Sequence, residues 1–186
     1  KFLRFVSVLI HLACVLLVFL IFRLLVRDDI IAGLTALLFG VHPMQVESVA
    51  WLTASMKIGT YALFFLLAIW AYIRYRSTEK KSFLILTIIS FLASCLCKEQ
   101  AVILPVALIA VDYLQGRDVF TKKVWLEKIH LFAISLIFGI VTLKASSSHS
   151  AEVVERVYNF EIGERVLFAM YSTGMYILKI IVPTDL

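Results

Sequence analysis

Lys98, Glu99 and Gln100 form a polar triplet between two apolar runs, with no hydrophilic loop around it. Ionisable side chains in such surroundings are costly to bury and usually face a cavity or a partner. An ammonium group suits a phosphate or pyrophosphate, and a neighbouring carboxylate suits a sugar hydroxyl or a structural ion pair. A second interpretation stays open, in which the triplet is a tight interfacial hairpin and Lys98 simply reaches toward water.

A second polar group begins at His42 and Pro43 and continues to Glu47 and Trp51. Proline restarts a helix after a break, and a histidine just before it either caps the break or presents its imidazole to a cavity. Glu47 and Trp51 are four residues apart and share one helical face. No His-Glu-x-x-His spacing is present, so the sequence predicts hydrogen-bonded structural groups here and no metal site.

Three other polar residues inside apolar runs are weaker candidates. We expect His11 and Asp112 to be satisfied by neighbouring helices, and Lys179 to extend toward the nearer membrane surface. The glycine-rich phosphate-binding motifs and the Gly-x-Ser-x-Gly motif are absent from the sequence, which excludes the usual routes to nucleotide hydrolysis and serine catalysis.

The composition indicates that membrane-spanning helices position these residues. Of the 186 residues, 62% are hydrophobic and 17% are charged, whereas soluble domains are about 45–50% apolar and about 25% charged. One helix that crosses a bilayer needs about 20 mainly apolar residues, so there is room for roughly five to seven crossings. The chain opens at Lys1 without methionine, and we expect it to be an internal piece of a longer polytopic membrane protein.

The apolar runs predict an all-α, polytopic helical membrane protein with about seven membrane segments, some of them short or broken. A helix break is expected at His42 and Pro43, a helical hairpin around Lys98, and a flexible connector over 146–150. The predicted segments are 5–26, 30–41 with 44–55, 59–75, 82–97, 101–114, 131–144 and 166–182.

Basic residues predict the orientation of these segments, because lysine and arginine collect in cytoplasmic loops. The loops 74–81 and 115–128 are rich in basic residues and should be cytoplasmic, whereas the stretch 144–165 has more acidic than basic residues and should be external. The alternation of segments then also places 1–4, 42–57 and 98–100 on the external face. The basic residues of the predicted cytoplasmic loops account for the formal net charge of +5. Nucleic-acid binding is therefore not predicted.

The segment 37–51, LLFGVHPMQVESVAW, resembles the LF-x-x-HP-x-x-VESVAW signature of the transmembrane and tetratricopeptide-repeat proteins. These are GT-C-type glycosyltransferases that depend on polyprenyl-phosphate sugars, with bacterial relatives. Further matching groups cover nearly the whole chain: 71–75, 98–100, 112–114, 163–165, Tyr176, Lys179 and 183–186.

The resemblance implies that residues 1–186 are part of one GT-C-like transmembrane domain in the bacterial inner membrane or the endoplasmic reticulum membrane. Such an enzyme transfers a sugar, often mannose, from a polyprenyl or dolichyl phosphate to a protein hydroxyl on the periplasmic or lumenal side. It also implies that the acidic catalytic residue lies upstream of Lys1 and that tetratricopeptide repeats follow the membrane region. No residue of this chain is therefore assigned as catalytic.

On this interpretation the donor is the lipid-linked sugar, and a divalent metal has no support in the sequence. The expected donor phosphate and sugar contacts are Lys98, Glu99 and Arg165. The expected supporting residues are His42, Glu47 and Gln100.

Two other functions stay open. The chain fits a non-catalytic membrane scaffold or assembly subunit of the same ancestry, and an acidic residue in the external loop upstream of Lys1 would distinguish the enzyme from it. It also fits a transporter or flippase for a lipid-linked or anionic solute, because broken helices occur in transporters. Inverted repeats would favour a transporter, and the sequence shows none.

Overall fold

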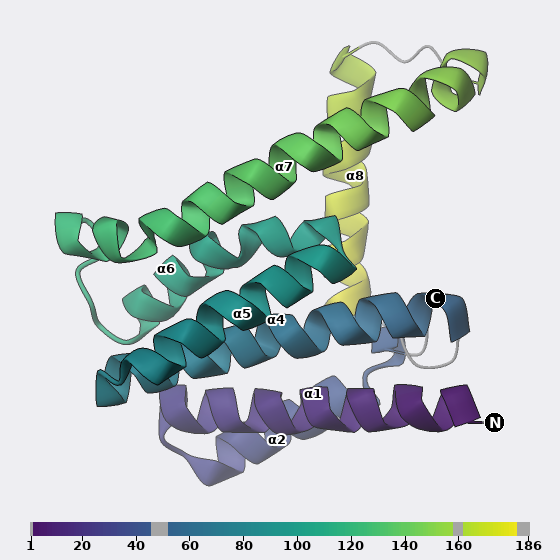
Figure 1. The fold of residues 1–186 in the computed structure, drawn as a ribbon. Coiled ribbons are helices and arrows are strands. Elements are labelled where there is room, and N and C mark those ends of the chain that lie inside the picture. Colours follow the sequence, from purple (N-terminus) through teal and green to yellow (C-terminus); the bar gives the residue numbers. More distant parts are fainter. Residues whose placement is uncertain (1, 46–51, 158–161, 182–186) are drawn as a thin grey trace. The chain divides into compact units, whose positions relative to one another are not determined.

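The computed structural model describes residues 2–45, 52–157 and 162–181, and their regular secondary structure is entirely helical (Figure 1). The all-α prediction is confirmed, and each predicted apolar segment contains a helix. The elements are α1 (Phe2–Val26), α2 (Asp29–Val41), η1 (Pro43–Gln45), α4 (Leu52–Thr78), α5 (Lys81–Cys97), η2 (Glu99–Ile103), α6 (Leu104–Leu114), α7 (Lys122–Val157) and α8 (Ile162–Ile181).

The chain divides into two compact units, Lys1–Gly139 and Ile140–Leu186. In the first unit α1 packs against α2 and α4, and α4 packs against α5 and α6. The second unit contains the last part of α7 and all of α8. The assignment of residues 1–186 to one transmembrane domain stays a prediction.

Three helical stretches in the described residues are long and apolar enough to cross a membrane: Phe2–Val26, Met56–Thr78 and Lys122–Ala145. The helices Asp29–Val41 and Lys81–Cys97 are apolar but shorter. Length and composition therefore support a helical membrane protein, and the predicted number of about seven crossings stays a prediction.

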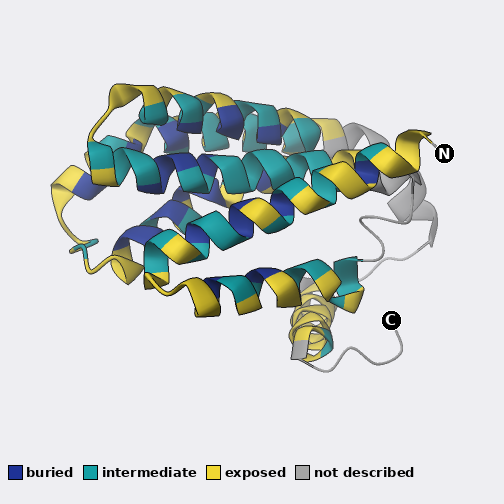
Figure 2. Ribbon diagram, turned by 90° about the horizontal axis from the view of Figure 1, so that it is seen from below, coloured by how far each residue is buried: buried dark blue, intermediate teal, exposed yellow. Residues whose placement is uncertain are grey.

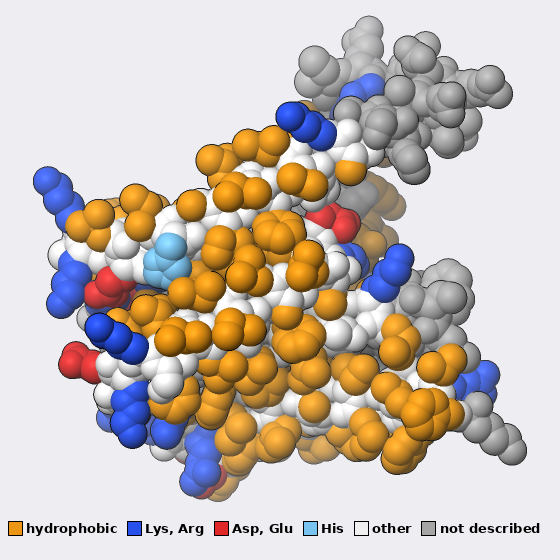
Figure 3. Space-filling model, viewed as in Figure 1, with side chains coloured by type: hydrophobic (Ala, Val, Ile, Leu, Met, Phe, Trp, Pro, Cys, Tyr) orange, Lys and Arg blue, Asp and Glu red, His pale blue; other side chains and the backbone are white. Residues whose placement is uncertain are grey.

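The exterior of the described chain is more apolar than that of a soluble domain, while its interior is mainly apolar with a few polar side chains (Figures 2 and 3). Large apolar residues such as Leu12, Leu38 and Ile89 are exposed. Several polar side chains are buried instead: Ser7, Thr87, Ser90, Ser94, Asp112 and Lys128. Lipid chains solvate an apolar exterior without cost, whereas polar groups in a membrane must find partners inside the bundle.

Side-chain to backbone hydrogen bonds join neighbouring helices of the first unit. The Ser94 hydroxyl donates to the Tyr61 carbonyl over 3.1 Å, and the Ser135 hydroxyl donates to the Val102 carbonyl over 2.8 Å. His11 Nε2 lies 3.0 Å from the carbonyl oxygen of Gly40 on α2. His11 is therefore satisfied by a neighbouring helix, as predicted, and these bonds are typical of helix packing in membranes.

The connections between the helices of the first unit lie at two opposite ends, a basic end and a turn end (Figure 1). The basic end carries the connections 27–28, 79–80 and 115–121. The turn end carries the start of α1, η1 and Lys98. The basic loops and the polar triplet thus lie at opposite ends, in agreement with the predicted alternation. The side of the membrane that each end faces stays a prediction.

Helix lengths correct three expectations about loops. The predicted flexible connector at 146–150 is wrong, because α7 continues from Lys122 to Val157. The stretch 145–157 contains neither glycine nor proline, so nothing in it interrupts the helical hydrogen bonds. Similarly, α7 begins inside the predicted 115–128 loop, and α4 extends to Thr78 inside the predicted 74–81 loop.

Candidate functional site

The triplet 98–100 lies at a sharp turn between two helices, which confirms the predicted helical hairpin. Helix α5 ends at Cys97, and Lys98 adopts an extended conformation with φ −155° and ψ 135°. The Lys98 amide donates to the Ser94 carbonyl over 3.0 Å, and its carbonyl accepts from the Ala101 amide over 3.2 Å. One turn of 3₁₀ helix follows, and Pro105 in the first turn of α6 is well placed to begin the next helix.

The side chains of the triplet are accessible at this turn. Lys98 is half-buried, whereas Glu99 and Gln100 are exposed. Within the described part of the chain none of the three side chains forms a hydrogen bond or ion pair with another residue. The Lys98 ammonium and the Glu99 carboxylate therefore remain available to an external partner, and their assignment to a sugar donor stays a prediction.

His42 ends α2 and supports the start of η1. Its backbone is extended, with φ −62° and ψ 129°, and its Nδ1 accepts a hydrogen bond of 3.2 Å from the Met44 amide. The predicted break at His42 and Pro43 is confirmed, and the imidazole contacts the backbone just after the break. Glu47 and Trp51 lie outside the described residues.

Arg165 is exposed and lies on α8, in the second unit, whereas Lys98 and Glu99 belong to the first unit. Within the first unit, Lys98, Glu99 and Gln100 lie together at one turn. A donor site shared by Arg165 and Lys98 stays a prediction.

A buried polar cluster that the sequence analysis did not assemble joins three helices of the first unit. The Tyr72 hydroxyl on α4 donates to the Asp112 carboxylate on α6, at 2.9 Å from Oδ2 and 3.1 Å from Oδ1. Lys128 on α7 forms an ion pair with Asp112 and donates a hydrogen bond of 2.7 Å to the Tyr72 hydroxyl. The side chains of Asp112 and Lys128 are both fully buried.

Two arginines surround this cluster at the basic end. Arg117 binds Glu127 through two hydrogen bonds of 2.7 and 2.9 Å and lies 3.3 Å from Asp112. The hydrogen bonds with Glu127 are the main reason that the pKa of Arg117 is raised above its ordinary value, so Arg117 stays charged. Arg76 Nε lies 3.8 Å from Asp112 Oδ1, which is an ion-pair distance but too long for a hydrogen bond.

The cluster is suited to holding helices together rather than to reacting with a substrate. Asp112 accepts hydrogen bonds from Tyr72, Lys128 and Arg117, so its carboxylate oxygens are occupied by the protein. A buried charge without such partners is strongly destabilising, and the three helices are therefore constrained to stay together. The expectation that neighbouring helices satisfy Asp112 is confirmed.

The sequence contained one signal for this cluster. An aspartate inside the apolar run 101–114 requires a cationic partner, but Lys128 was assigned to the predicted 115–128 loop. That assignment is wrong, because Lys128 is fully buried on α7. Among the described residues, no group of three or more His, Cys, Asp or Glu side chains is arranged to hold a metal ion.

The described residues thus form an all-helical structure with three candidate membrane-spanning helices and a buried polar cluster inside a mainly apolar core. A 97-residue segment of this chain is 36% identical to the protein O-mannosyl-transferase Tmtc1 of Drosophila melanogaster. The match covers 52% of this chain and 11% of the length of that relative. No protein-family model matches the chain, and no solved structure gives a significant match. The match supports a relationship to glycosyltransferases of this kind.

Proposed function

We propose that this chain is part of the membrane region of a GT-C-type glycosyltransferase that uses a lipid-linked sugar. The enzyme transfers a sugar such as mannose from a polyprenyl or dolichyl phosphate to a protein hydroxyl. It lies in the endoplasmic reticulum membrane or the bacterial inner membrane, with the turn end on the lumenal or periplasmic side. Tetratricopeptide repeats belong to the same full-length protein.

The observation that carries this proposal is the match to a protein O-mannosyl-transferase. The likeness of 37–51 to the signature of the transmembrane and tetratricopeptide-repeat proteins supports it from the sequence. The exposed apolar surface supports it physically, because a polyprenyl chain needs an apolar surface beside a polar headgroup site.

In this proposal Lys98 neutralises the phosphate of the donor. A charge-assisted contact to the donor phosphate is stronger than a neutral hydrogen bond, and the Lys98 ammonium has no carboxylate partner in the described residues. Glu99 accepts a hydrogen bond from a sugar hydroxyl, and Arg165 adds a second cation. His42, Glu47 and Gln100 support the site, and the acidic catalytic residue comes from an external loop upstream of Lys1.

The test is a transfer assay with the full-length protein in liposomes, with polyprenyl-phosphate mannose as donor and an acceptor protein. Lys98→Ala is expected to lower transfer at least tenfold and to raise KM for the donor, while Lys98→Arg retains part of the activity because it keeps the charge. Lys81→Ala is the matched control, since Lys81 is an exposed lysine at the other end of α5. It is expected to transfer at the wild-type rate.

Size-exclusion chromatography checks that each variant is folded. A folded Lys98→Ala protein with wild-type transfer would show that Lys98 only anchors the turn. A wild-type protein that transfers no sugar from any polyprenyl-phosphate donor would favour a non-catalytic membrane scaffold of the same ancestry.

A further inference from the structure

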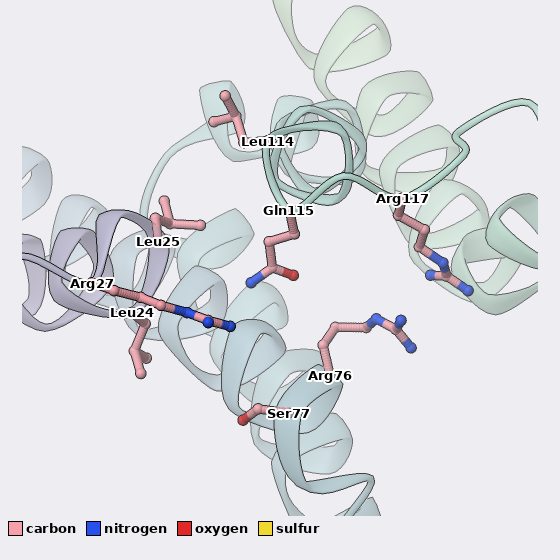
Figure 4. Close-up of a pocket in the computed structure, with 8 residues that line it drawn as sticks. All are labelled: Leu24, Leu25, Arg27, Arg76, Ser77, Leu114, Gln115 and Arg117. Atoms are coloured by element: carbon pink, nitrogen blue, oxygen red, sulfur yellow. The ribbon is translucent and has the colours of Figure 1, made fainter.

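A cavity of about 420 Å³ lies at the basic end, between the ends of α1, α4 and α6 (Figure 4). Its polar lining comes from Arg27, Arg76, Gln115 and Arg117, together with a serine, and its apolar lining consists of leucines. Figure 4 shows Arg27 and Gln115 pointing toward one another across the cavity, while Arg76 extends from α4 toward Arg117. All of these residues belong to the first unit.

The cavity is strongly electropositive. Three of its lining residues are arginines, and none is acidic. The carboxylates of Asp112 and Glu127, which lie beside Arg117, are already engaged by Lys128 and Arg117. Guanidinium groups gathered in one cavity repel each other, and an anion bound among them removes that repulsion.

Hydrogen-bond donors in the cavity are unused. Arg76 Nε is buried and donates no hydrogen bond, since Asp112 is too far away at 3.8 Å. Arg27 and the Gln115 side chain have no ion-pair or hydrogen-bond partner among the described residues. A buried donor normally has a partner in a native protein, so Arg76 Nε points to a ligand that accepts hydrogen bonds. Arg27 and Gln115 are exposed, and their side chains are accessible to the same ligand.

The backbone at Arg27 is a second, independent observation. Arg27 directly follows α1 and has φ 59°, in the left-handed region that glycine normally occupies after a helix. A residue other than glycine is strained in this conformation, and such strain is often retained where it serves a function. Here the strained residue supplies a guanidinium to the cavity.

We propose that this cavity binds a phosphate group. Planar guanidinium forks match phosphate oxygens in pairs, with Arg27 and Arg76 as the principal contacts, Gln115 as a neutral donor, and Arg117 as a nearby fixed charge. Leu24, Leu25 and Leu114 line the same cavity and suit the apolar part of an amphiphile. The phosphate is therefore that of an acidic phospholipid or a free phosphate, and the predicted cytoplasmic side of this end offers both.

The test measures the thermal unfolding midpoint of the full-length protein in detergent with three additives: phosphatidylglycerol, phosphatidylcholine and inorganic phosphate. A ligand that binds the folded state raises the midpoint. We expect phosphatidylglycerol to raise it and phosphatidylcholine not to do so. A rise with inorganic phosphate as well would identify the free anion as a sufficient ligand.

Arg27→Gly tests the guanidinium without adding backbone strain. Glycine adopts φ 59° freely, so the variant loses the charge while its backbone becomes more stable in this conformation. This variant should fold at least as well as the wild type and bind at least tenfold more weakly, and Arg76→Gln should also weaken binding. Two controls stand at the same end. Glu79→Gly relieves the same backbone conformation, with φ 57°, and Lys80→Ala removes an exposed cation that does not line the cavity.

Both controls should keep the full shift. The proposal is overturned if neither anion shifts the midpoint of the wild type, or if Arg27→Gly and Arg76→Gln respond as strongly as Lys80→Ala. Sugar transfer is not measured in this experiment, so its outcome is independent of the proposed activity at the turn end.

Discussion

The carboxylates at the basic end of the first unit and the polar triplet at its turn end differ in their partners. At the basic end the carboxylates of Asp112 and Glu127 are bound by cations of the protein itself. At the turn end Lys98 and Glu99 have no side-chain partner among the described residues. Charges that are paired inside a bundle fix helices in place, whereas unpaired charges at a turn are free to recognise something else. Asp112 and Glu127 are thus structural, whereas Lys98 and Glu99 make no such contact and their proposed role in recognition is open to test.

The basic end and the turn end are predicted to lie on opposite sides of the membrane. In a background with Cys14, Cys95 and Cys97 replaced by alanine, single cysteines at Ser77 and Gln100 test this, because both positions are exposed. Basic loops favour the cytoplasm, so in sealed vesicles with the cytoplasmic face inside a membrane-impermeant maleimide should label the Gln100→Cys protein directly and the Ser77→Cys protein only after lysis. Labelling of both from one side would invalidate the proposed arrangement.

The largest stability effect should come from the buried ion pair. Lys128→Ala leaves Asp112 buried beside fewer cations and should lower the free energy of unfolding by about 3–5 kcal/mol, measured by denaturation in mixed micelles. Lys81→Ala, at an exposed site near the same end, should change it by less than about 0.5 kcal/mol.

Combining Asp112→Leu with Lys128→Met should recover most of the loss, because replacing both partners with apolar groups removes the unpaired charge. A loss from Lys128→Ala no greater than that from Lys81→Ala would show that the buried ion pair adds nothing to the stability of the protein.

A smaller effect is expected from the hydroxyl that joins Asp112 to Lys128. Tyr72→Phe keeps the ring but leaves both groups with one hydrogen-bond partner fewer, and should cost about 1–3 kcal/mol. Tyr75→Phe is the control, since its ring lies 6.4 Å from that of Tyr72 and its hydroxyl has no hydrogen bond within the described chain. Equal effects in the same denaturation assay would mean that the Tyr72 hydroxyl adds nothing to the cluster.

Much of the fold could be predicted because it depends on local sequence. Apolar runs gave the positions of the helices, and the break after Val41 followed from Pro43, which cannot donate the backbone bond of a continuous helix. The turn at Lys98 was recognisable as a polar interruption between two apolar runs.

The buried cluster could not be assembled from the sequence, because its members are distant along the chain. Tyr72 and Asp112 are separated by 40 residues, and Lys128 lies a further 16 residues away. The burial of Asp112 was predictable from its apolar surroundings. Which basic residue pairs with it depends on which helices pack together, and the sequence alone does not give that packing. A count of basic residues also cannot distinguish a solvated loop lysine from Lys128, which is buried in the first turns of α7.

The pairing of Asp112 with Lys128 has a consequence for how the protein enters the membrane during synthesis. A single charge at the centre of a membrane helix costs about 2.5–3.5 kcal/mol on insertion, and less toward its ends. As the chain leaves the ribosome, Asp112 on α6 appears before its partner on α7, and only the short connection 115–121 separates the two helices. Insertion of α6 and α7 together as a hairpin would bring Lys128 to Asp112 within the membrane, in addition to Arg117 from the connection between them.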